Sequence, residues 1–413
     1  MAASLPPQDR FRTAERRRDL RATLFQFDQP AFWFYVVIVV VTGWYAISRQ
    51  NVFHHISPSG WVLSWGLLIV YALPVFLAVY LLDLYEREPM SLVVASVVWG
   101  AVAATTLAGL ADQGWGLVVA RLGGPEFASR WTAALTAPWV EEALKVAGVV
   151  LVCLIAPNRV DDMMDGFVYG SMCGLGFAVV EDVFYFVGVF GGTTSGVLEG
   201  FYVRVVSSGL YGHVMFTGLA GMGVAYCLSR NGQASLRRRV GVAVGLFAAA
   251  VVGHFLWNSP WLDLFPSGLS SVGDWLLIPL AAAVKGLPLA AFVIIAVWLA
   301  RRRERRWLHA ALSSELGTPG ISASELGVLL DPVARRRSVR QMRTRAGDRA
   351  ASLLKRLQRE QVNLAMIRAR SVPDHDPELV RQRKQCKSIR DALMAMPGAA
   401  PAARPTAAPY GSA

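Results

Sequence analysis

The sequence predicts an all-α, polytopic membrane protein with about eight transmembrane helices and a cytoplasmic C-terminal tail. Three observations predict this fold class: an apolar composition, eight long apolar windows, and basic residues gathered at the chain ends. Of the 413 residues, 54% are hydrophobic and 17% are charged, and the mean hydropathy is +0.40. These values are high for a soluble protein of this length, so we expect the chain to lie in a bilayer.

Eight windows of about 18 or more mostly apolar residues are long enough to cross the hydrocarbon layer as helices. They lie near residues 30–48, 60–82, 90–110, 132–156, 163–190, 203–229, 240–258 and 276–300. An N-terminus inside the cell places the arginine-rich connection 230–239 on the cytoplasmic side and makes residues 111–131, 191–202 and 259–275 outer loops. We therefore predict a multi-pass protein of the plasma membrane with both termini in the cytoplasm.

The net charge of +12 is unevenly distributed along the chain. An N-terminal tail (1–29) carries +2 and a C-terminal tail (301–413) carries +13, whereas the transmembrane domain (30–300) carries −3. Basic tails predict contact with anionic lipid headgroups, and nucleic-acid binding is the weaker alternative. Apolar residues at helical spacing near 341–370 predict an amphipathic helix, on the membrane surface or against a partner. The Pro- and Ala-rich end of the chain is expected to be disordered.

Two residue types within the windows are interpreted as structural. Gly166, Gly170 and Gly174 follow each other at four-residue spacing, which gives a smooth helix face for close packing. The cysteines have no paired spacing, so we expect neither a disulfide framework nor a zinc ribbon. They are Cys153, Cys173, Cys227 and Cys386.

Most charged residues fall between the windows, and the few polar residues inside them are candidates for chemistry, because ionisable groups are costly in hydrocarbon. A count of 1.5 Å per residue from the predicted outer ends places these groups at similar depths in the outer half of the bilayer. We therefore expect four helices to form one polar chamber. Its candidate residues are Glu141, Glu142, Lys145, Glu181, His213, His254 and Asn258.

Spacing along the helices suggests how these residues divide the work. Glu141 and Glu142 lie four and three residues before Lys145, so the lysine can neutralise one carboxylate and leave the other as a general base. His254 and Asn258 also share a helix face and can stabilise an oxyanion. The structural alternatives are an intramembrane ion pair in the fourth window, and helix caps or interhelical hydrogen bonds for the other polar residues.

Five motifs together indicate a family. They are "DLYEREP" after the second window, "EEALK" from Glu141 to Lys145, "GFAVVE" ending at Glu181, "GHVMFTG" around His213, and "HFLWN" from His254 to Asn258. This set, over about residues 83–260, resembles the PrsW intramembrane protease family. That family is similar to a larger group with the type II CAAX prenyl endopeptidases and the bacteriocin-processing enzymes. Those relatives pair a double-Glu motif ending in Arg with Phe-x-x-x-His, whereas this chain has Lys145 and Glu181 there, as the PrsW branch does.

The resemblance implies an intramembrane endopeptidase that acts on membrane-anchored proteins, with site-1 cleavage of an anti-sigma factor as the implied reaction. In our hypothesis a glutamate of the fourth window activates a water, and His254 with Asn258 holds the oxyanion. Two routes stay open. The glutamates and histidines could hold zinc, with Glu181, His213 and His254 as candidate ligands. Alternatively Glu142 acts as the base without a metal, since no compact zinc motif occurs.

A proton-coupled transporter is the alternative function, because Glu, His and Lys inside membranes also form proton relays. It predicts inverted repeats with Gly- or Pro-broken helices in matching halves, which the sequence does not display. An inactive scaffold is disfavoured because every polar position of the motif set is retained. Lys285 and Asp182 are interpreted as structural, since no other intramembrane polar residue aligns with them.

Overall fold

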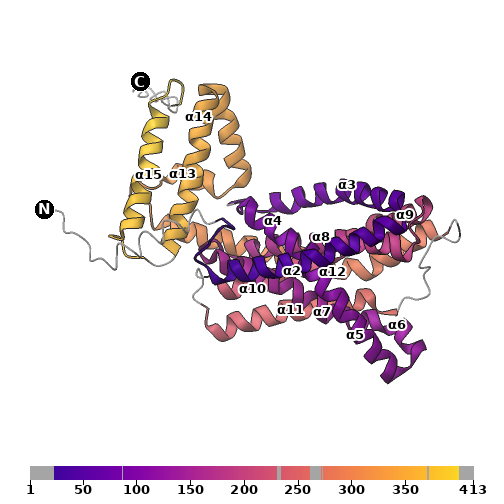
Figure 1. The fold of residues 1–413 in the computed structure, drawn as a ribbon. Helices are drawn as coiled ribbons and strands as arrows, with labels where there is room; N and C mark the ends of the chain where they lie inside the picture. Colours follow the sequence, from indigo (N-terminus) through magenta and orange to yellow (C-terminus); the bar gives the residue numbers. More distant parts are fainter. Residues whose placement is uncertain are drawn as a thin grey trace, which may run out of the picture. The chain divides into compact units, whose positions relative to one another are not determined.

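Helices make up most of the part of the chain that the computed structural model describes (Figure 1). These ranges are residues 23–85, 87–229, 234–260, 271, 273–369 and 372–399. The all-α prediction is confirmed. The chain forms two compact units: the first comprises Met1–Asp83 with Arg87–Arg302, and the second comprises Leu84–Glu86 with Arg303–Ala413.

Six helices of the described chain are long and apolar enough to cross a membrane. They are α2 (Pro30–Ile56), α3 (Pro58–Leu82), Met90–Gly123 (α4 Met90–Val98, η1 Trp99–Ala104 and α5 Thr105–Gly123), Met163–Val189 (α8 Met163–Phe184 and η3 Tyr185–Val189), α11 (Leu236–Asn258) and α12 (Asp274–Ser313). The other two predicted windows fall on α7 (Ala137–Ile155), which carries three ionisable residues, and on α10 (His213–Leu228), which has only 16 residues. The chain is therefore a multi-pass membrane protein, and the count of eight spans stays a prediction.

The outer helices of the first unit turn apolar side chains away from the bundle. In α2 and α3 only 17% of the apolar window is buried, and Trp44 and Val70 are 80% and 73% exposed. Such faces suit contact with lipid, which is as apolar as they are. Polar residues such as Glu142 and Lys145 are instead fully buried. The bundle is thus apolar outside and locally polar inside.

Helix α8 lies in the middle of the first unit and packs against α10, α3, α4 and α7 (Figure 1). The predicted packing role of its glycines is confirmed, because a Cβ at Gly166, Gly170 or Gly174 would collide with the α10 backbone. At Gly174 the colliding group is the carbonyl of His213. The glycine face of α8 therefore brings the first turn of α10 close to the centre of the bundle.

Local signals fix where the helices around this centre begin. Helix α7 has Pro138 in its first turn, where a missing N–H is harmless. Helix α8 begins at a capping box. The Asp162 carboxylate accepts from backbone N–H groups of the first turn, and the Asp165 carboxylate accepts from the backbone N–H of Asp162. Helix α10 begins directly after Gly212, so that His213 is its first residue.

Three segments differ from the sequence prediction. The window 203–229 is not one helix. A short π-helix, η4 (Tyr202–Val206), and a 3₁₀ helix, η5 (Gly209–Tyr211), precede α10. The serines and glycines between residues 207 and 212 are weak helix formers, which explains the break. The expected outer loop 111–131 is a helical hairpin of α5 and α6 (Pro125–Leu135), which turns at Gly124 with φ of 85°. Likewise 191–202 contains α9 (Thr194–Phe201).

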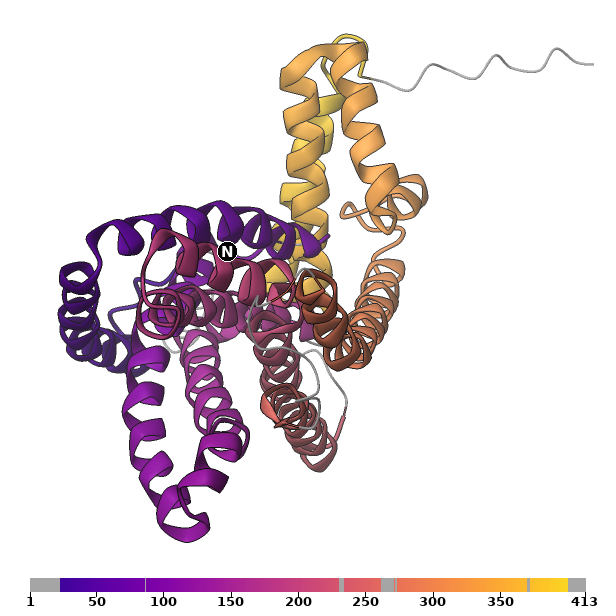
Figure 2. The same cartoon turned by 90° about the vertical axis from the view of Figure 1, so that its right-hand side faces the viewer.

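The second unit is a folded helical unit at the end of the chain. It contains α13 (Ala323–Leu329), α14 (Pro332–Ala369), which kinks at Gly347, and α15 (Pro377–Met394), with α14 and α15 side by side (Figure 2). The predicted amphipathic segment 341–370 falls in α14, and its residues Leu357, Leu364 and Ile367 are buried. Residues 1–22 of the predicted N-terminal tail lie outside the described residues, and so do residues 400–413 of the predicted disordered end, which begins at Pro397.

Candidate active site

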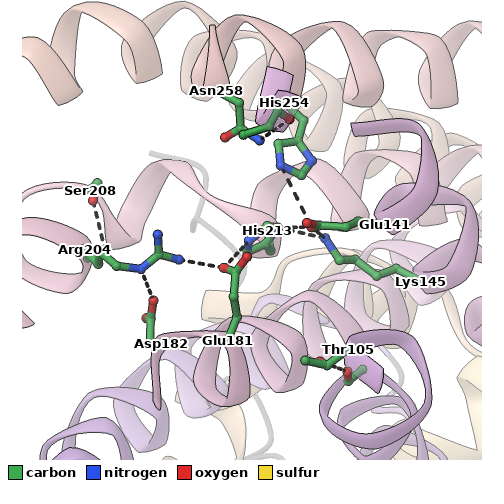
Figure 3. A network of polar contacts seen from close by, with 12 residues as sticks. Thr105, Glu141, Lys145, Glu181, Asp182, Arg204, Ser208, His213, His254 and Asn258 are labelled. Atoms are coloured by element: carbon green, nitrogen blue, oxygen red, sulfur yellow. Dashed lines mark hydrogen bonds and ion pairs between the residues drawn. The ribbon is translucent and has the colours of Figure 1, made fainter. Parts of the chain in front are cut away.

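Five of the predicted residues converge in the first unit, from three helices. Figure 3 labels four of them: Glu141, Lys145, His213 and His254. Glu141, Glu142 and Lys145 lie in the first half of α7, His213 is the first residue of α10, and His254 lies in the last turns of α11. Ligand atoms of the two glutamates and the two histidines all lie within 4.8 Å of one another. The four groups are therefore close enough to bind one ion or one reacting molecule.

The ammonium of Lys145 lies at the centre of this cluster. Its Nζ is 2.9 Å from Glu141 Oε2, 2.9 Å from Glu142 Oε1 and 2.8 Å from His213 Nδ1. An ammonium has three N–H donors, so each acceptor receives one. The interpretation that Lys145 neutralises one glutamate and frees the other is wrong, because the three- and four-residue spacings put both carboxylates within its reach.

The two glutamates differ in how their oxygens are used. Glu142 is fully buried: Oε1 is bound by Lys145 and lies 3.1 Å from His254 Nδ1, and Oε2 accepts from Thr217 Oγ1 at 2.9 Å. Glu141 makes all its hydrogen bonds and ion pairs to described residues through Oε2. Its Oε1 is therefore the carboxylate oxygen best placed to accept from a water. Thr217 was missed by the sequence analysis, although it stands inside the "GHVMFTG" motif.

His213 is held from its other ring nitrogen by Glu181, whose Oε2 is 3.1 Å from Nε2. Because the Lys145 ammonium only donates, His213 Nδ1 accepts its hydrogen bond. The His213 proton is therefore on Nε2, which donates a hydrogen bond to Glu181 Oε2. Arg204 of η4 in turn bonds Glu181 Oε2 at 2.6 Å and Asp182 Oδ1 at 2.5 Å. Glu181, a predicted metal ligand, thus lies behind His213 and outside the group of four, and Asp182 pairs with Arg204.

The polar residues of α11 and α12 near the cluster also contact neighbouring helices. His254 stacks on Phe216, with ring centroids 4.7 Å apart and an interplanar angle of 8°. The Asn258 amide donates to the Ala133 carbonyl of α6 at 3.2 Å, so one of its two N–H groups is used away from the cluster. Lys285 donates to two carbonyls at the end of α11, at 3.0 and 3.2 Å. These contacts agree with a structural role for Lys285.

Exposure falls steadily from Arg204 towards the cluster. The side chain of Arg204 is 26% exposed and that of Glu181 18%, followed by His213 at 12%, Glu141 at 5% and Glu142 at 0%. The cluster is therefore more open on the side of Arg204 and Glu181 than on the side of Glu142.

Asp112 of α5 is a further polar residue near the cluster that the sequence analysis missed. It interacts electrostatically with Glu141, Glu181 and Lys145, and its Oδ1 is buried without a hydrogen-bond partner among the described residues. Asp112 was not considered because residues 111–131 were predicted to form an outer loop. The signal that could have found it is the absence of proline throughout the apolar segment 105–123.

Neighbouring helices fix the α7 backbone where it carries the cluster. Trp99 Nε1 donates to the Leu144 carbonyl at 2.9 Å, and Cys173 Sγ is 3.5 Å from the Lys145 carbonyl. The Phe177 ring lies 3.8 Å from Lys145 Nζ, a cation–π contact. All four cysteines are free.

The "DLYEREP" motif contributes to a second acidic group. Ligand atoms of Asp83, Glu88 and Asp165 lie within 4.8 Å of one another. Asp165 Oδ2 accepts from two backbone N–H groups of its capping box, at 2.7 and 2.9 Å, and Glu88 accepts from the Tyr169 hydroxyl. We interpret this acidic group as structural, because its carboxylates accept hydrogen bonds at the start of α8.

The first cluster has the donor chemistry of a zinc site. Catalytic zinc takes three protein ligands from His and Asp or Glu and keeps one position open. Glu141, Glu142, His213 and His254 offer such donors, and three of the four already surround a cation, the Lys145 ammonium, at 2.8–2.9 Å. The residues present therefore fit a bound divalent ion.

Comparison with known proteins matches the part of the chain that carries this cluster. The model of a family described as PrsW family intramembrane metalloprotease matches residues 88–299. Protease PrsW of Bacillus subtilis (strain 168) is 31% identical over 110 residues, which are 26% of this chain and 47% of that protein. The match thus spans about half the length of this curated relative. No solved structure matches the chain.

Proposed function

Because the chain belongs to the PrsW family of intramembrane metalloproteases, we propose that it is an intramembrane endopeptidase that hydrolyses peptide bonds of membrane-anchored proteins. The observation that carries this proposal is the convergence of Glu141, Glu142, His213 and His254 within a helical bundle whose outer faces are apolar. Two carboxylates and two imidazoles in one buried cluster are the groups that peptide hydrolysis needs: a base for water and donors for an oxyanion.

Glu141 is the proposed general base. Its Oε1 accepts the proton of a water, which then attacks the carbonyl of a peptide that arrives from the side of Arg204 and Glu181. The charge that develops on the carbonyl oxygen is stabilised by His254 in its imidazolium form, which donates from Nε2 while Nδ1–H stays hydrogen-bonded to Glu142, and by the second N–H of Asn258 one turn away. The Glu141 carboxyl then returns its proton to the leaving amine, so that acid and base roles alternate.

Zinc is the metal that we propose for this cluster, with three of the side chains of Glu141, Glu142, His213 and His254 as its ligands and the fourth position open to a water. When bound, zinc would lower the pKa of a water and polarise the peptide carbonyl. With or without the ion, the side chains of Glu141, Glu142, His213 and His254 would orient one another and exclude solvent from the cluster. Metal content of purified active protein, followed by titration with a chelator, tests this: activity without stoichiometric metal would exclude the zinc route and leave Glu141 or Glu142 as unaided base.

We propose the plasma membrane as the location, with both termini in the cytoplasm, and a membrane-anchored anti-sigma factor as the first substrate to test, because the resemblance to PrsW proteins implies it. Family membership does not favour the proton-coupled transporter. A survey of membrane proteins that accumulate uncleaved when Glu142→Ala replaces the wild type would identify the substrate directly.

The proposal is tested by comparing wild type with Glu141→Ala, Glu142→Ala and His254→Ala. We expect each variant to insert and accumulate in the membrane while cleavage of the substrate is lost. Glu126→Gln, at an exposed glutamate of α6, is the matched control and should cleave normally. Full cleavage by all three alanine variants would refute the proposed function.

A further inference from the structure

The Lys145 ammonium occupies the point on which the metal-ligating atoms converge. Glu141 Oε2, Glu142 Oε1 and His213 Nδ1 all approach Nζ within 2.8–2.9 Å. Zinc bonds to carboxylate oxygen and imidazole nitrogen are about 2.0–2.2 Å long, so a short inward movement of the same three atoms would suit an ion at that point. An ion and the ammonium cannot occupy the point together.

We propose that Lys145 is a built-in competitor of the metal, so that a divalent ion binds to this cluster only when the Lys145 side chain has been displaced. This inference rests on the proposed function, because it concerns how the same cluster is loaded for catalysis. Lys145 would hold the two carboxylates and His213 together in the metal-free protein and would lower the affinity for the ion.

Three features favour the ammonium in its observed place. It is fully buried, so that water does not replace its partners. Its three N–H donors meet three acceptors, and the face of Phe177 lies 3.8 Å from Nζ. A divalent ion must therefore displace a well-bound cation, and any position that Lys145 takes nearby still repels it by direct charge interaction.

The test compares zinc binding by the purified full chain and by Lys145→Met, which keeps an unbranched side chain in the buried space and removes the charge. We expect Lys145→Met to bind zinc about tenfold or more tightly than wild type, because a neighbouring positive charge is gone. Equal or weaker binding by Lys145→Met would overturn the inference. Binding is followed by metal content after dialysis and by the absorption spectrum of cobalt as a replacement ion.

Lys285→Met is the matched control, because it removes a partly buried lysine of the first unit whose hydrogen bonds go to the end of α11. Its zinc affinity should equal that of wild type. Adding Glu142→Gln to Lys145→Met should abolish the gain in affinity, which would place the ion in the cluster. A gain that survives Glu142→Gln would contradict the inference.

A second measurement on wild type covers the case in which Lys145→Met does not fold. Nitrogen-15 labelling of the lysine side chains, with Lys145→Arg to assign the signal, reports on Nζ directly. Zinc should shift the Lys145 signal and leave that of Lys285 unchanged. Stoichiometric zinc binding with an unchanged Lys145 signal would refute the competition.

The failures of this inference and of the proposed function can be told apart. Equal zinc affinities in wild type and Lys145→Met, together with cleavage that depends on Glu142, would refute only the competition. Cleavage that survives Glu142→Ala would refute the proposed function, whatever the zinc affinities are.

Discussion

Glu142 in the first unit and Glu315 in the second unit, called the C-terminal unit below, are both fully buried carboxylates with different partners. Glu315 is held by the guanidinium of Arg383 through two bonds, Nε to Oε2 at 2.6 Å and Nη2 to Oε1 at 2.8 Å. Glu142 is held by one ammonium, one imidazole and one hydroxyl, from Lys145, His254 and Thr217. The two short bonds of Glu315 come from one rigid fork, with Thr318 Oγ1 at 3.2 Å and Arg368 Nε at 3.4 Å as further partners. The donors to Glu142 belong instead to three separate side chains without a guanidinium.

The difference indicates what each charge is for. A guanidinium is planar, always charged and bidentate, which makes it a lasting partner for a buried carboxylate but not a group that exchanges for a metal or passes a proton. Imidazole does both of these things. We therefore interpret Glu315 as a structural anchor of the C-terminal unit and Glu142 as part of a reactive centre.

The largest effect is expected for His254→Ala, which removes a partner of Glu142. Cleavage should fall by about 100- to 1,000-fold, the usual loss when an oxyanion donor is removed. Initial rates with purified, reconstituted protein measure this loss. Phe216→Leu keeps an apolar contact beside the imidazole and serves as a control that should retain most activity. A His254→Ala rate within a few-fold of wild type would remove the distinction between the two glutamates.

Arg383→Met breaks the corresponding contact of Glu315 and should affect stability instead of cleavage. Loss of one partner of a buried pair costs about 3–5 kcal/mol, and we expect about 2–3 kcal/mol here because Arg368 Nε remains 3.4 Å from Glu315 Oε1. Hydrogen exchange in α13 to α15 of the full chain measures the loss. Lys387→Met, on the exposed face of α15, is the control. Unchanged exchange with lost cleavage would contradict the structural role.

Arg204→Met should have an intermediate effect on cleavage. Arg204 holds Glu181, and Glu181 orients His213, so the variant disturbs the cluster only indirectly. Loss of such an outer partner typically costs about 10- to 100-fold in metal affinity or activity. Arg204→Lys, which keeps the charge, should restore part of the rate. Wild-type rate and zinc affinity in Arg204→Met would show that Glu181 needs no support.

The smallest effect concerns Glu325, whose carboxylate bonds Arg390 at 2.7 Å through both oxygens. Burial raises the pKa of Glu325, but the hydrogen bonds from Arg390 and the Ser322 backbone outweigh it and leave the pKa below its usual value. A lowered folded pKa stabilises the unit above the unfolded pKa of about 4.3 and loses that contribution as the pH falls through the folded value.

The stabilisation by Glu325 should be under about 1 kcal/mol, because the pair is partly solvated. Hydrogen exchange should distinguish Glu325→Gln from wild type near neutral pH and no longer do so in acid. Asp391→Asn removes an exposed pair with Lys387 and should change nothing at either pH. A difference between Glu325→Gln and wild type that grows in acid would reverse the sign of this argument.

The helical class and the five residues of the cluster were predictable, because each depends on local pattern. Apolar windows define spans, and three- and four-residue spacings put Glu141, Glu142 and Lys145 on one face. The depth count then linked these residues to His213 and His254, and the structure brings all five together.

The rest depends on contacts between distant segments. Neither the binding of both glutamates by Lys145 nor the pairing of Arg204, on a π-helix, with Glu181 could be predicted from the sequence. The same holds for Asp112, which belongs to a helix and not to a loop. The C-terminal unit is the clearest case. Glu315 stands in a polar stretch with no pattern of burial, and only its pairing with Arg383, 68 residues later, identifies it as a core residue.

The most direct test of the central claim uses Glu142→Gln and Glu315→Gln in one assay. Each variant replaces a fully buried carboxylate by an amide of the same shape, in purified full chain reconstituted with a membrane-anchored substrate. We predict that Glu142→Gln inserts normally but no longer cleaves, whereas Glu315→Gln still cleaves and shows faster hydrogen exchange in α13 to α15. Cleavage by Glu142→Gln at the wild-type rate would contradict the assignment of a catalytic centre to this cluster.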